Sequence, residues 1–374
     1  MRRTESERLR SDVEALAAIQ RGSASSGERV SAQWVADRLR EVGAQSVRIE
    51  PFRYQSTFAH AQAAHFMTGA LAALEGSRAA AAAALVSFEF DYSGRSQWLR
   101  RLLPAGEGAN VVGRLPARGR PRSTLVLVAH HDAAHTGLMW DPRLLAAGDR
   151  AAARSGRRAS LALVPELAFL SAVLGGRVPR TLAVALLGLS TALLADQARS
   201  PSVPGANDNA SGVAGMLALV ARLAAEGPDG LEVIALAPGC EESGMGGMSA
   251  WLRSPAARLD PETTLVLGLD TIGSGEPVVL EAEGGLWPVR YRAQDVSRAA
   301  QAAGGAGIHL RRWRIGGWTD PVLARLAGLP AVSLLSVRDG GFPNYHRPTD
   351  IPAHVDFACV QACLLAAHAI ALTA

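Results

Sequence analysis

Three histidines and an aspartate follow a run of β-forming residues in the stretch Leu-Val-Leu-Val-Ala-His-His-Asp-Ala-Ala-His, residues 125–135. Imidazoles and carboxylates are ligands that zinc accepts. Side chains two positions apart in an extended strand point to the same side, which groups His130 with Asp132 and turns His131 away. A metal-bound histidine usually has its second ring nitrogen fixed by a carboxylate. The stretch therefore predicts His130 as a metal ligand and Asp132 as the acid that orients it.

The other two histidines receive different interpretations. His131 is expected to pack or to line a pocket, because it faces away from His130. His135 lies too far into the following loop to be assigned a role.

A second candidate ligand stands in the turn Pro-Gly-Ala-Asn-Asp-Asn-Ala-Ser-Gly, residues 204–212, where Asp208 precedes an apolar helix. For a lone aspartate, helix capping would be the expected role. A carboxylate on a tight loop can also bridge two cations about 3.5–4 Å apart, because each oxygen can bind a different ion.

Two further motifs place acids at the ends of apolar strands. Glu241 and Glu242 stand side by side at the edge of a glycine-rich loop, and Asp270 ends the strand Thr-Leu-Val-Leu-Gly-Leu-Asp. Adjacent acids repel each other unless a positive charge lies nearby, which suggests that one carboxylate binds a metal while its neighbour takes a proton. A buried carboxylate such as Asp270 is costly unless it is hydrogen-bonded or bound to a cation.

His346, in a turn-rich loop before the last helix, completes the candidate set. Mixed imidazole and carboxylate ligands fit zinc, with cobalt or manganese as substitutes. If Asp208 bridges, each of two ions receives three protein ligands. One ion would take His130, Asp208 and Asp270, and the other Asp208, Glu242 and His346, while Glu241 stays free to act as a base.

The elements that position these residues alternate along the chain. Apolar strand patterns lie at 46–50, 110–114, 124–129, 231–237, 264–270, 277–280 and 330–335. Helical patterns lie at 9–22, 25–43, 210–226, 245–253, 289–303, 320–327 and 354–372. The second helix begins with Ser25 and Glu28 at the spacing of a capping box. This alternation favours an α/β fold, a three-layer αβα arrangement around a mostly parallel, mixed central sheet, with chemistry gathered at the carboxyl ends of the strands.

Two apolar segments interrupt the alternation. We expect them to be helical insertions, at 57–104 and 143–204, in a single domain that covers residues 1–374. In the second insertion, residues 159–176 carry Glu166 as their only charge, and 181–195 carry none. Helices of these lengths measure about 22–27 Å, which is short of a hydrocarbon core of about 30 Å and disfavours a clean two-pass span.

The preferred interpretation of 143–204 is an antiparallel helical hairpin. It would pack against the two apolar stretches of the first insertion, at 57–74 and 79–88, against the sheet or against a second subunit. Partial insertion into one leaflet stays open, because nearby arginines would face anionic headgroups. These arginines are Arg154, Arg157, Arg158 and Arg199. The apolar hairpins are therefore candidates for two kinds of contact, a peripheral contact with a membrane and the interface of a homodimer.

The composition limits the class of partner and the compartment. A chain of 374 residues with 48% hydrophobic and 19% charged residues is typical of a globular protein. Its net charge of +4 comes without a long basic run, so nucleic-acid binding is not expected. Three cysteines leave an odd count, which suits a reducing compartment, and the first two dozen residues lack the apolar core of a signal peptide. We expect a cytoplasmic protein, with association to the inner face of the membrane left open.

Five ordered motifs resemble those of the co-catalytic zinc aminopeptidases typified by bacterial leucyl aminopeptidases. The motifs are His130-x-Asp132, Gly205-Ala-Asn-Asp208-Asn-Ala-Ser-Gly, Glu241-Glu242-x-Gly, Asp270-x-Ile-Gly and Tyr345-His346-x-Pro-x-Asp350. Glutaminyl cyclases, glutamate carboxypeptidase-like enzymes and the inactive transferrin-receptor ectodomain are relatives of that family. The resemblance covers roughly 10–56 and 108–374 and excludes the apolar insertions.

The resemblance implies a zinc-dependent exopeptidase that removes N-terminal amino acids from short peptides or cleaves other small amides. His130, Asp208, Glu242, Asp270 and His346 would be the ligands of two zinc ions, Asp208 would bridge them, and Glu241 would be the general acid and base. Tyr345 would help to hold the developing oxyanion. The element Trp318-Thr-Asp320 matches a serine-aspartate element near the family's substrate pocket, with threonine in place of serine.

Three other functions remain open. A single-zinc glutaminyl cyclase shares the same acids and histidines and would bind one ion instead of two. A non-catalytic relative would have lost ligands, which this chain retains. A membrane-tethered scaffold would use the apolar hairpins. The sequence leaves undetermined the preferred N-terminal residue and the choice among aminopeptidase, carboxypeptidase, amidohydrolase and cyclase activity.

Overall fold

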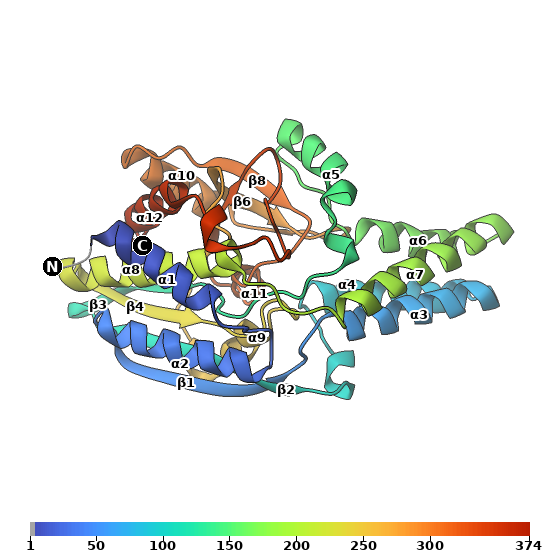
Figure 1. Ribbon diagram of the computed structural model, residues 1–374, viewed down its shortest axis with the longest axis horizontal. Helices are drawn as coiled ribbons and strands as arrows, with labels where there is room; N and C mark the ends of the chain where they lie inside the picture. The colour runs from blue at the N-terminus through green and yellow to red at the C-terminus, as the bar shows by residue number, and fades with distance from the viewer. Residues whose placement is uncertain (1–3) are drawn as a thin grey trace.

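The computed structural model describes residues 4–374, so the first three residues of the N-terminal stretch considered for a signal peptide lie outside the described residues (Figure 1). Within the described range, nine strands form one sheet in the order β1-β2-β4-β3-β5-β9-β6-β7, and β8 pairs with β6. The strands are β1 Gln45–Tyr54, β2 Gly106–Leu115, β3 Arg118–Val128, β4 Asp229–Ala237, β5 Thr264–Leu269, β6 Glu276–Glu283, β7 Val289–Arg290, β8 Arg311–Ile315 and β9 Ala331–Val337.

The middle of the sheet is parallel. β3 pairs with β4 on one side and with β5 on the other, and β5 pairs with β9. Val126 of β3 lies opposite both Ile234 of β4 and Val266 of β5, so the carboxyl ends of these strands finish at about the same level. The outer pairings β1–β2, β2–β4, β9–β6 and β6–β7 are antiparallel, which makes the sheet mixed.

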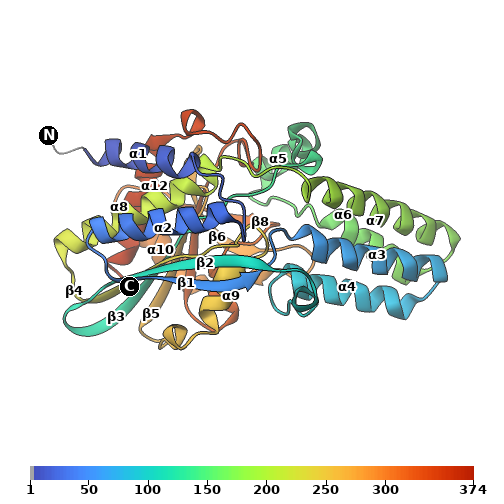
Figure 2. The same cartoon turned by 60° about the horizontal axis from the view of Figure 1, so that its bottom comes forward.

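Helices cover both faces of the sheet, which confirms the three-layer αβα arrangement (Figure 2). One layer contains α1 Glu5–Ala17, α2 Ser26–Glu41, α8 Gly212–Glu226, α10 Ala293–Gly305 and α12 Phe357–Ala371. The other contains the short helices α9 Gly246–Leu252 and α11 Pro321–Leu326. Because both faces are covered, the central strands are buried on both sides and are apolar along most of their length.

Three helix predictions need correction. The helix expected at 289–303 begins only at Ala293, because Val289–Arg290 form β7 and pair with β6. The first helix spans Glu5–Ala17 and not 9–22, because the chain beyond it turns inward to bury the guanidinium of Arg21. Ser25 caps α2 by accepting a hydrogen bond from the amide of Glu28, at 3.2 Å. The Glu28 carboxylate does not return that bond; it accepts from the amides of Ala24 and Ala109 instead. The capping box is therefore only half formed, because this carboxylate links α2 to the sheet.

Four helices project from one end of the sheet, and we call them the helical arm (Figures 1 and 2). They are α3 Ala59–Glu75, α4 Arg78–Tyr92, α6 Leu163–Leu174 and α7 Arg177–Gln197. α3 and α6 each contact both α4 and α7, so the two sequence segments form one bundle. The bundle has its own core, which includes Phe66, Phe88 and Phe169, with ring centroids 5.1 Å apart for Phe66 and Phe88. The remaining helix of the second segment, α5 Pro142–Ser155, lies at the root of the arm.

Candidate metal centre

The candidate ligands from four strands lie at one edge of the sheet. His130 follows β3, Glu242 follows β4, Asp270 directly follows β5, and His346 lies in the loop after β9. Because the parallel strands end at the same level, the loops that follow them meet. Asp208 reaches the same place from the irregular turn Ala206–Ser211 that precedes α8.

The two histidines approach Asp208 from opposite sides. Nε2 of His130 lies 3.4 Å from Oδ1 of Asp208, and Nε2 of His346 lies 3.2 Å from Oδ2. The same nitrogen of His346 is 3.0 Å from Oε2 of Glu242. Asp208 therefore presents one oxygen to each histidine, as a bridging carboxylate must.

Three groups of side chains bring their ligand atoms within 4.8 Å of one another. Two of them match the sets expected from the sequence: His130 with Asp208 and Asp270, and Asp208 with Glu242 and His346. The third group contains His130, Glu241 and Glu242, so Glu241 lies beside the ligands as well.

The donor atoms fit bound cations. Oδ2 of Asp208, Oε1 of Glu242 and both ring nitrogens of His346 are buried without a hydrogen-bond partner, which is costly unless something else pairs with them. A tetrahedral zinc ion with ligands at about 2.0–2.1 Å keeps its ligand atoms about 3.3 Å apart. The nitrogen-to-oxygen distances of 3.0–3.4 Å around Asp208 are close to that spacing.

Asp132 connects the histidine strand to the loop with the two glutamates. Its Oδ1 lies 3.3 Å from Nδ1 of His130 and accepts a hydrogen bond from the amide of Glu241, at 3.1 Å. Its Oδ2 accepts from the amide of Glu242, at 3.2 Å, and from the hydroxyl of Ser23, at 2.6 Å. Asp132 is fully buried, so these contacts fix both His130 and the glutamate pair.

The turn with Asp208 is held by residues that the sequence did not identify as functional. The Asp350 carboxylate accepts hydrogen bonds from the amides of Asn207 and Asp208, at 2.8 and 3.0 Å. The buried guanidinium of Arg21 donates to the carbonyls of Pro204 and Gly205. Asp350 stood in a quoted motif but had no role assigned, and Arg21 gave no signal, because it lies 187 positions before Asp208.

The side chain of Asn209 connects the same turn to the end of β5. Its amide nitrogen donates to the carbonyl of Leu269, at 3.0 Å, and its oxygen accepts from the amide of Thr271, at 3.2 Å. These two partners flank Asp270. The bridging position and the end of β5 are therefore fixed relative to each other.

The electrostatics of the cluster favour a cation. Burial raises the pKa of Asp270 to about 7, although His130 opposes the shift. Burial also raises the pKa of Glu241 well above its usual value. Burial opposes the ionisation of Asp208, but the imidazoles of His130 and His346 close to its two oxygens outweigh it and lower the Asp208 pKa. Burial lowers the pKa of His346, but Glu242 and Asp208 outweigh it and raise the value to about 9. The negative charge of these carboxylates is therefore larger than the positive charge that two protonated imidazoles can supply.

Aromatic rings cover His346. Tyr345 stacks on the imidazole with ring centroids 3.8 Å apart and an interplanar angle of 21°. Trp140 meets the same imidazole edge-on at 4.2 Å. Trp140 was missed because it stands just before the second apolar segment, where no polar motif surrounds it.

Asp320 lies near the cluster with both carboxylate oxygens buried and unpartnered. Burial raises its pKa well above the usual value, and Asp132, Asp270 and Glu283 add to the shift against the opposing charge of His130. The preceding Thr319 is fixed by Glu283, which accepts hydrogen bonds from its amide and hydroxyl at 2.6 and 2.7 Å.

The other two histidines of the first motif lie outside the cluster. The ring nitrogens of His131 are within 2.7 Å of the Ser31 hydroxyl and 2.8 Å of the Ala109 carbonyl, and burial lowers the His131 pKa to about 4. His131 is therefore a neutral packing residue. Nδ1 of His135 bonds to the carbonyl of Ser200 at 2.6 Å, which ties the chain before the second apolar segment to the end of that segment.

Comparisons with known proteins agree with this geometry. Residues 191–371 match the model of Peptidase family M28. No curated protein has a sequence that matches the chain. The fold is similar to that of an aminopeptidase from Aneurinibacillus sp. strain AM-1, with a TM-score of 0.59 at 12% identity over 98% of this chain and 92% of the other.

Two further solved structures have similar folds. A zinc aminopeptidase from Bacillus subtilis gives a TM-score of 0.56 at 14% identity, covering 98% of this chain and 94% of the other. A glutaminyl cyclase from Tannerella forsythia gives a TM-score of 0.59 at 13% identity, covering 99% of this chain and 98% of the other. The resemblance found in the sequence is thereby confirmed, and the chain has the fold of the M28 zinc peptidases. These low identities do not distinguish aminopeptidase from cyclase activity.

Proposed function

From the premise that residues 191–371 match Peptidase family M28, we propose that this protein is a two-zinc exopeptidase that removes N-terminal amino acids from short peptides. The observation that carries the proposal is the position of Asp208, whose two oxygens face two different histidines. His130 and Asp270 complete one ligand set, and Glu242 and His346 complete the other. Two ligand sets that share one carboxylate support a pair of ions, and the number of ions per chain separates this proposal from a single-zinc cyclase with the same acids and histidines.

A pair of zinc ions bound there lowers the pKa of a coordinated water toward neutrality and polarises a carbonyl oxygen. Glu241 is the residue of this chain suited to move the proton, because it lies at the cluster and belongs to neither of the two sets that share Asp208. Its Oε2 is 3.9 Å from Nε2 of His130, and about a tenth of its side chain is exposed. Burial raises its pKa, so the carboxylate can accept a proton from water and return it to the leaving amine.

Asp320 and Tyr345 are proposed to contact the substrate. The unpartnered carboxylate of Asp320 suits the ammonium group of a peptide N-terminus, because an ion pair would satisfy oxygens that are otherwise buried alone. Tyr345 stacks on His346, which places its phenol beside the ligands, where it can donate to a developing oxyanion.

A substrate of limited size is proposed because the second apolar segment begins and ends beside the cluster. His135, eight residues before this segment, bonds to Ser200 near its end, and Trp140, just before the segment, covers His346. Short peptides and other small amides fit such a restricted entrance better than folded proteins do.

Cyclisation of N-terminal glutamine is the second candidate. It is supported by the fold, since the Tannerella forsythia glutaminyl cyclase is as similar to this chain as the Aneurinibacillus aminopeptidase is, with TM-scores of 0.59 for both. The two candidates differ in what they require of the metal centre and of the substrate.

The decisive experiment compares the wild type with Glu241→Gln by metal analysis and by turnover of aminoacyl-anilides and of peptides that begin with glutamine. The wild type is expected to bind two zinc ions per chain and to release amino acids. Glu241→Gln is expected to keep its zinc and to lose turnover by about 10²–10⁴-fold, the usual contribution of general acid–base catalysis.

An exposed acid supplies the matched control. Glu262→Gln removes an exposed carboxylate just before β5, at the opposite edge of the sheet from the cluster, and should leave both zinc content and turnover unchanged. One zinc ion per chain together with cyclisation of N-terminal glutamine would show that the protein is a glutaminyl cyclase and not an exopeptidase. Unchanged turnover in Glu241→Gln would remove this residue from the mechanism.

A further inference from the structure

The surface of the helical arm is apolar on all four helices. Large hydrophobic side chains are exposed on every one of them: Met67, Leu71 and Leu74 on α3, Val86 and Phe90 on α4, Leu163, Val164, Leu167 and Leu174 on α6, and Val178, Leu182 and Leu189 on α7. A soluble protein rarely exposes a continuous apolar surface of this kind, so the arm is expected to have a partner.

Charges are confined to the two ends of the arm. Residues 61–74, 79–88, 167–176 and 181–195 contain no Asp, Glu, Lys or Arg. At the tip lie Glu75, Arg78, Arg177 and Arg180. The two turns of the arm meet there, because a Cβ atom on Gly76 would touch Arg180 and one on Gly175 would touch Arg78. A charge-free belt therefore surrounds the arm between its root and its tip.

Three hydroxyl groups within this belt bond to carbonyls of their own helices. Thr68 donates to the carbonyl of Ala64, Ser171 to that of Leu167, and Thr191 to that of Leu187, at 2.8–2.9 Å. A hydroxyl that bonds to its own helix needs no water. These helices could therefore lose contact with water at little cost.

Small side chains bring the four helices close together. The distal core of the arm consists of Ala72, Ala73, Ala81, Ala172 and Ala183. Gly69 of α3 packs against Phe169 of α6, where a Cβ atom would come within 2.2 Å of the ring. Packing through small residues is typical of helices that associate within lipid.

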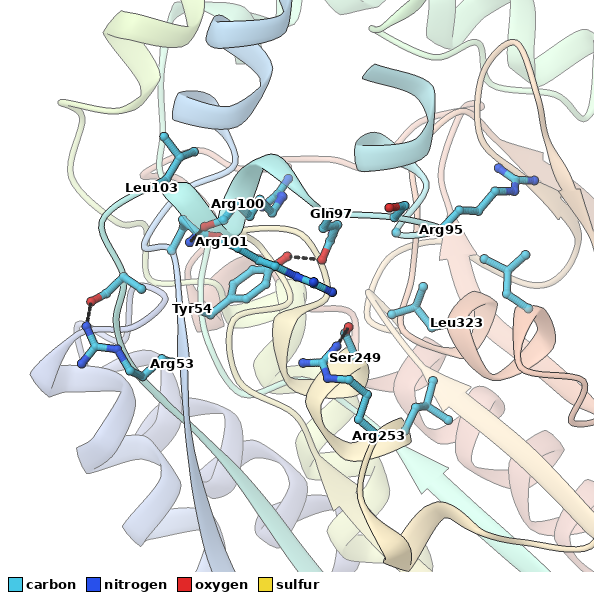
Figure 3. Close-up of a pocket in the computed structure, with 16 residues that line it drawn as sticks. Arg53, Tyr54, Arg95, Gln97, Arg100, Arg101, Leu103, Ser249, Arg253 and Leu323 are labelled. Carbon is cyan, nitrogen blue, oxygen red and sulfur yellow. Dashed lines mark hydrogen bonds between the residues drawn. The ribbon is translucent and has the colours of Figure 1, made fainter. Parts of the chain in front are cut away.

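Arginines surround the root of the arm on two sides. A cavity of about 850 Å³ beside the segment 93–104 is lined by Arg53, Arg95, Arg100, Arg101 and Arg253, and by no acidic side chain (Figure 3). Arg100 is neutralised by the buried Asp91, which leaves four arginines to attract an anion. On the opposite side of the root, helix α5 carries Arg143, Arg150 and Arg154 (Figure 1).

Aromatic and apolar side chains lie at the same level as these arginines. Trp98 is half exposed and Leu102 is 74% exposed, and both belong to the segment that borders the cavity. Tryptophan and arginine side by side are typical of the boundary between hydrocarbon and headgroups.

We propose that the helical arm inserts tip first into a lipid bilayer, with the arginines at its root against anionic headgroups. α7, Arg177–Gln197, has a length and composition suited to crossing a membrane, and only 17% of its most apolar window is buried within the protein. The charge-free belt is 10–15 residues long, or about 15–22 Å, which is shorter than a hydrocarbon core of about 30 Å. The arginines at the tip then extend toward the far headgroups while the bilayer thins around the arm.

Lipid fits the arm better than a second copy of the chain. A partner subunit would cover one side of the bundle and leave the hydrophobic side chains on the other helices in water. Lipid can surround the bundle and cover the hydrophobic side chains that are exposed on all four helices. The arginines at the root also have no matching acidic surface at the tip of the arm, where Glu75 lies among Arg78, Arg177 and Arg180.

Vesicle flotation tests this proposal. The full-length protein is mixed in mild detergent with vesicles of phosphatidylcholine, alone or with phosphatidylglycerol, and the detergent is then removed. The wild type is expected to float with both kinds of vesicle, more strongly with the anionic ones, and to stay bound after washes with high salt and alkaline carbonate. Leu71→Asp combined with Leu182→Asp should reduce the floated fraction at least about tenfold, because two charges enter the hydrocarbon.

The controls separate insertion from other contacts. Val30→Asp combined with Leu372→Asp changes two equally exposed residues outside the arm and should float like the wild type. Arg101→Gln combined with Arg253→Gln should weaken the preference for anionic vesicles, because two of the arginines at the root lose their charge. Circular dichroism checks folding, and Leu189→Asp alone, at a position 58% exposed within the charge-free belt, replaces the arm pair if the pair does not fold.

Three results would overturn the proposal. A wild type that remains at the bottom of the gradient would exclude lipid binding. Release of the wild type by high salt would limit the contact to headgroups. Flotation of the arm variants at the wild-type level, or conversion of a non-floating wild-type dimer into a monomer by these variants, would assign the arm to another partner.

Discussion

Asp132 is not a candidate ligand, but the geometry of the cluster depends on it more than on any other supporting residue. Its Oδ1 lies 3.3 Å from Nδ1 of His130, and its carboxylate accepts hydrogen bonds from the backbone amides of Glu241 and Glu242. A carboxylate offers acceptors on both oxygens, whereas an amide has one acceptor and one donor. An amide at this position would point its NH₂ group at a backbone N–H or force the ring of His130 to turn.

We predict that Asp132→Asn lowers zinc affinity or turnover by about 10–100-fold, the usual effect of removing a partner of a metal-bound histidine. Competition with a chromogenic chelator measures the affinity, and kcat/KM on an aminoacyl-anilide measures the turnover. Ser23→Ala removes only the hydroxyl that donates to Asp132, so its effect should be clearly smaller. Wild-type values for both quantities in Asp132→Asn would show that the carboxylate does not orient His130.

Sequence reasoning located the acids and histidines of the cluster because each stands in a short polar motif at a strand end. It could not locate Arg21, which supports the turn of Asp208 from far away in the sequence. It also missed Trp140, because an aromatic residue in an apolar stretch looks like any core residue. Supporting side chains carry no local pattern, so only the folded chain reveals them.

Among the elements, the segment 93–104 connects the helical arm to the cluster. The guanidinium of Arg100 bonds to both oxygens of Asp91, at the end of α4, and donates to the carbonyl of Ser243, next to Glu242. Arg100 is 4% exposed and Asp91 is fully buried, so neither charge is solvated by water. A buried ion pair of this kind is costly to break, because the remaining charge has no partner.

We predict that Arg100→Met lowers the free energy of unfolding by about 3–5 kcal/mol, since Asp91 would be left buried and unpaired. Denaturant unfolding followed by circular dichroism measures the change. Arg101→Met is the matched control, because this neighbouring arginine is exposed and should shift stability by less than about 0.5 kcal/mol. Equal stabilities for the two variants would mean that the Arg100–Asp91 pair contributes nothing to folding.

The central strands could be predicted because burial on both faces makes them continuous apolar runs. β8, Arg311–Ile315, could not, because three of its five residues are arginines and only Trp313 and Ile315 face the core. It is held by pairing with β6, which is a long-range contact. Helix α1 was misplaced by several residues, since the chain that follows it is shaped by the burial of Arg21 and not by helical periodicity.

For the whole molecule, the sequence predicted two apolar segments and left open what they pack against. The structure joins them in one bundle, and the reason is the small residues on all four helices that pack together in its core. Such a match depends on shape, which composition does not record. The resulting molecule has a covered α/β sheet at one end, an apolar arm at the other and the acidic cluster near the root of the arm, where the second segment begins and ends.

The acidic cluster also makes the stability of the whole chain depend on bound metal. Burial raises the pKa of Asp270 and Glu241 because nothing among the described residues neutralises all of these acids. A ligand that binds only the folded state stabilises it by about 4 kcal/mol when its concentration is 1,000 times its Kd. We therefore predict that stripping the metal with a chelator lowers Tm by about 5 °C or more, and that adding zinc restores it.

Asp208→Asn separates this linkage from a general effect of the chelator. The variant loses a charge of the carboxylate that faces both histidines, so its Tm should respond to the chelator far less than that of the wild type. Differential scanning calorimetry of both proteins, with and without chelator, gives the four values needed. A wild-type Tm that ignores the chelator would show that the acids and histidines converge without binding a metal, and a variant that responds like the wild type would place the ion away from Asp208.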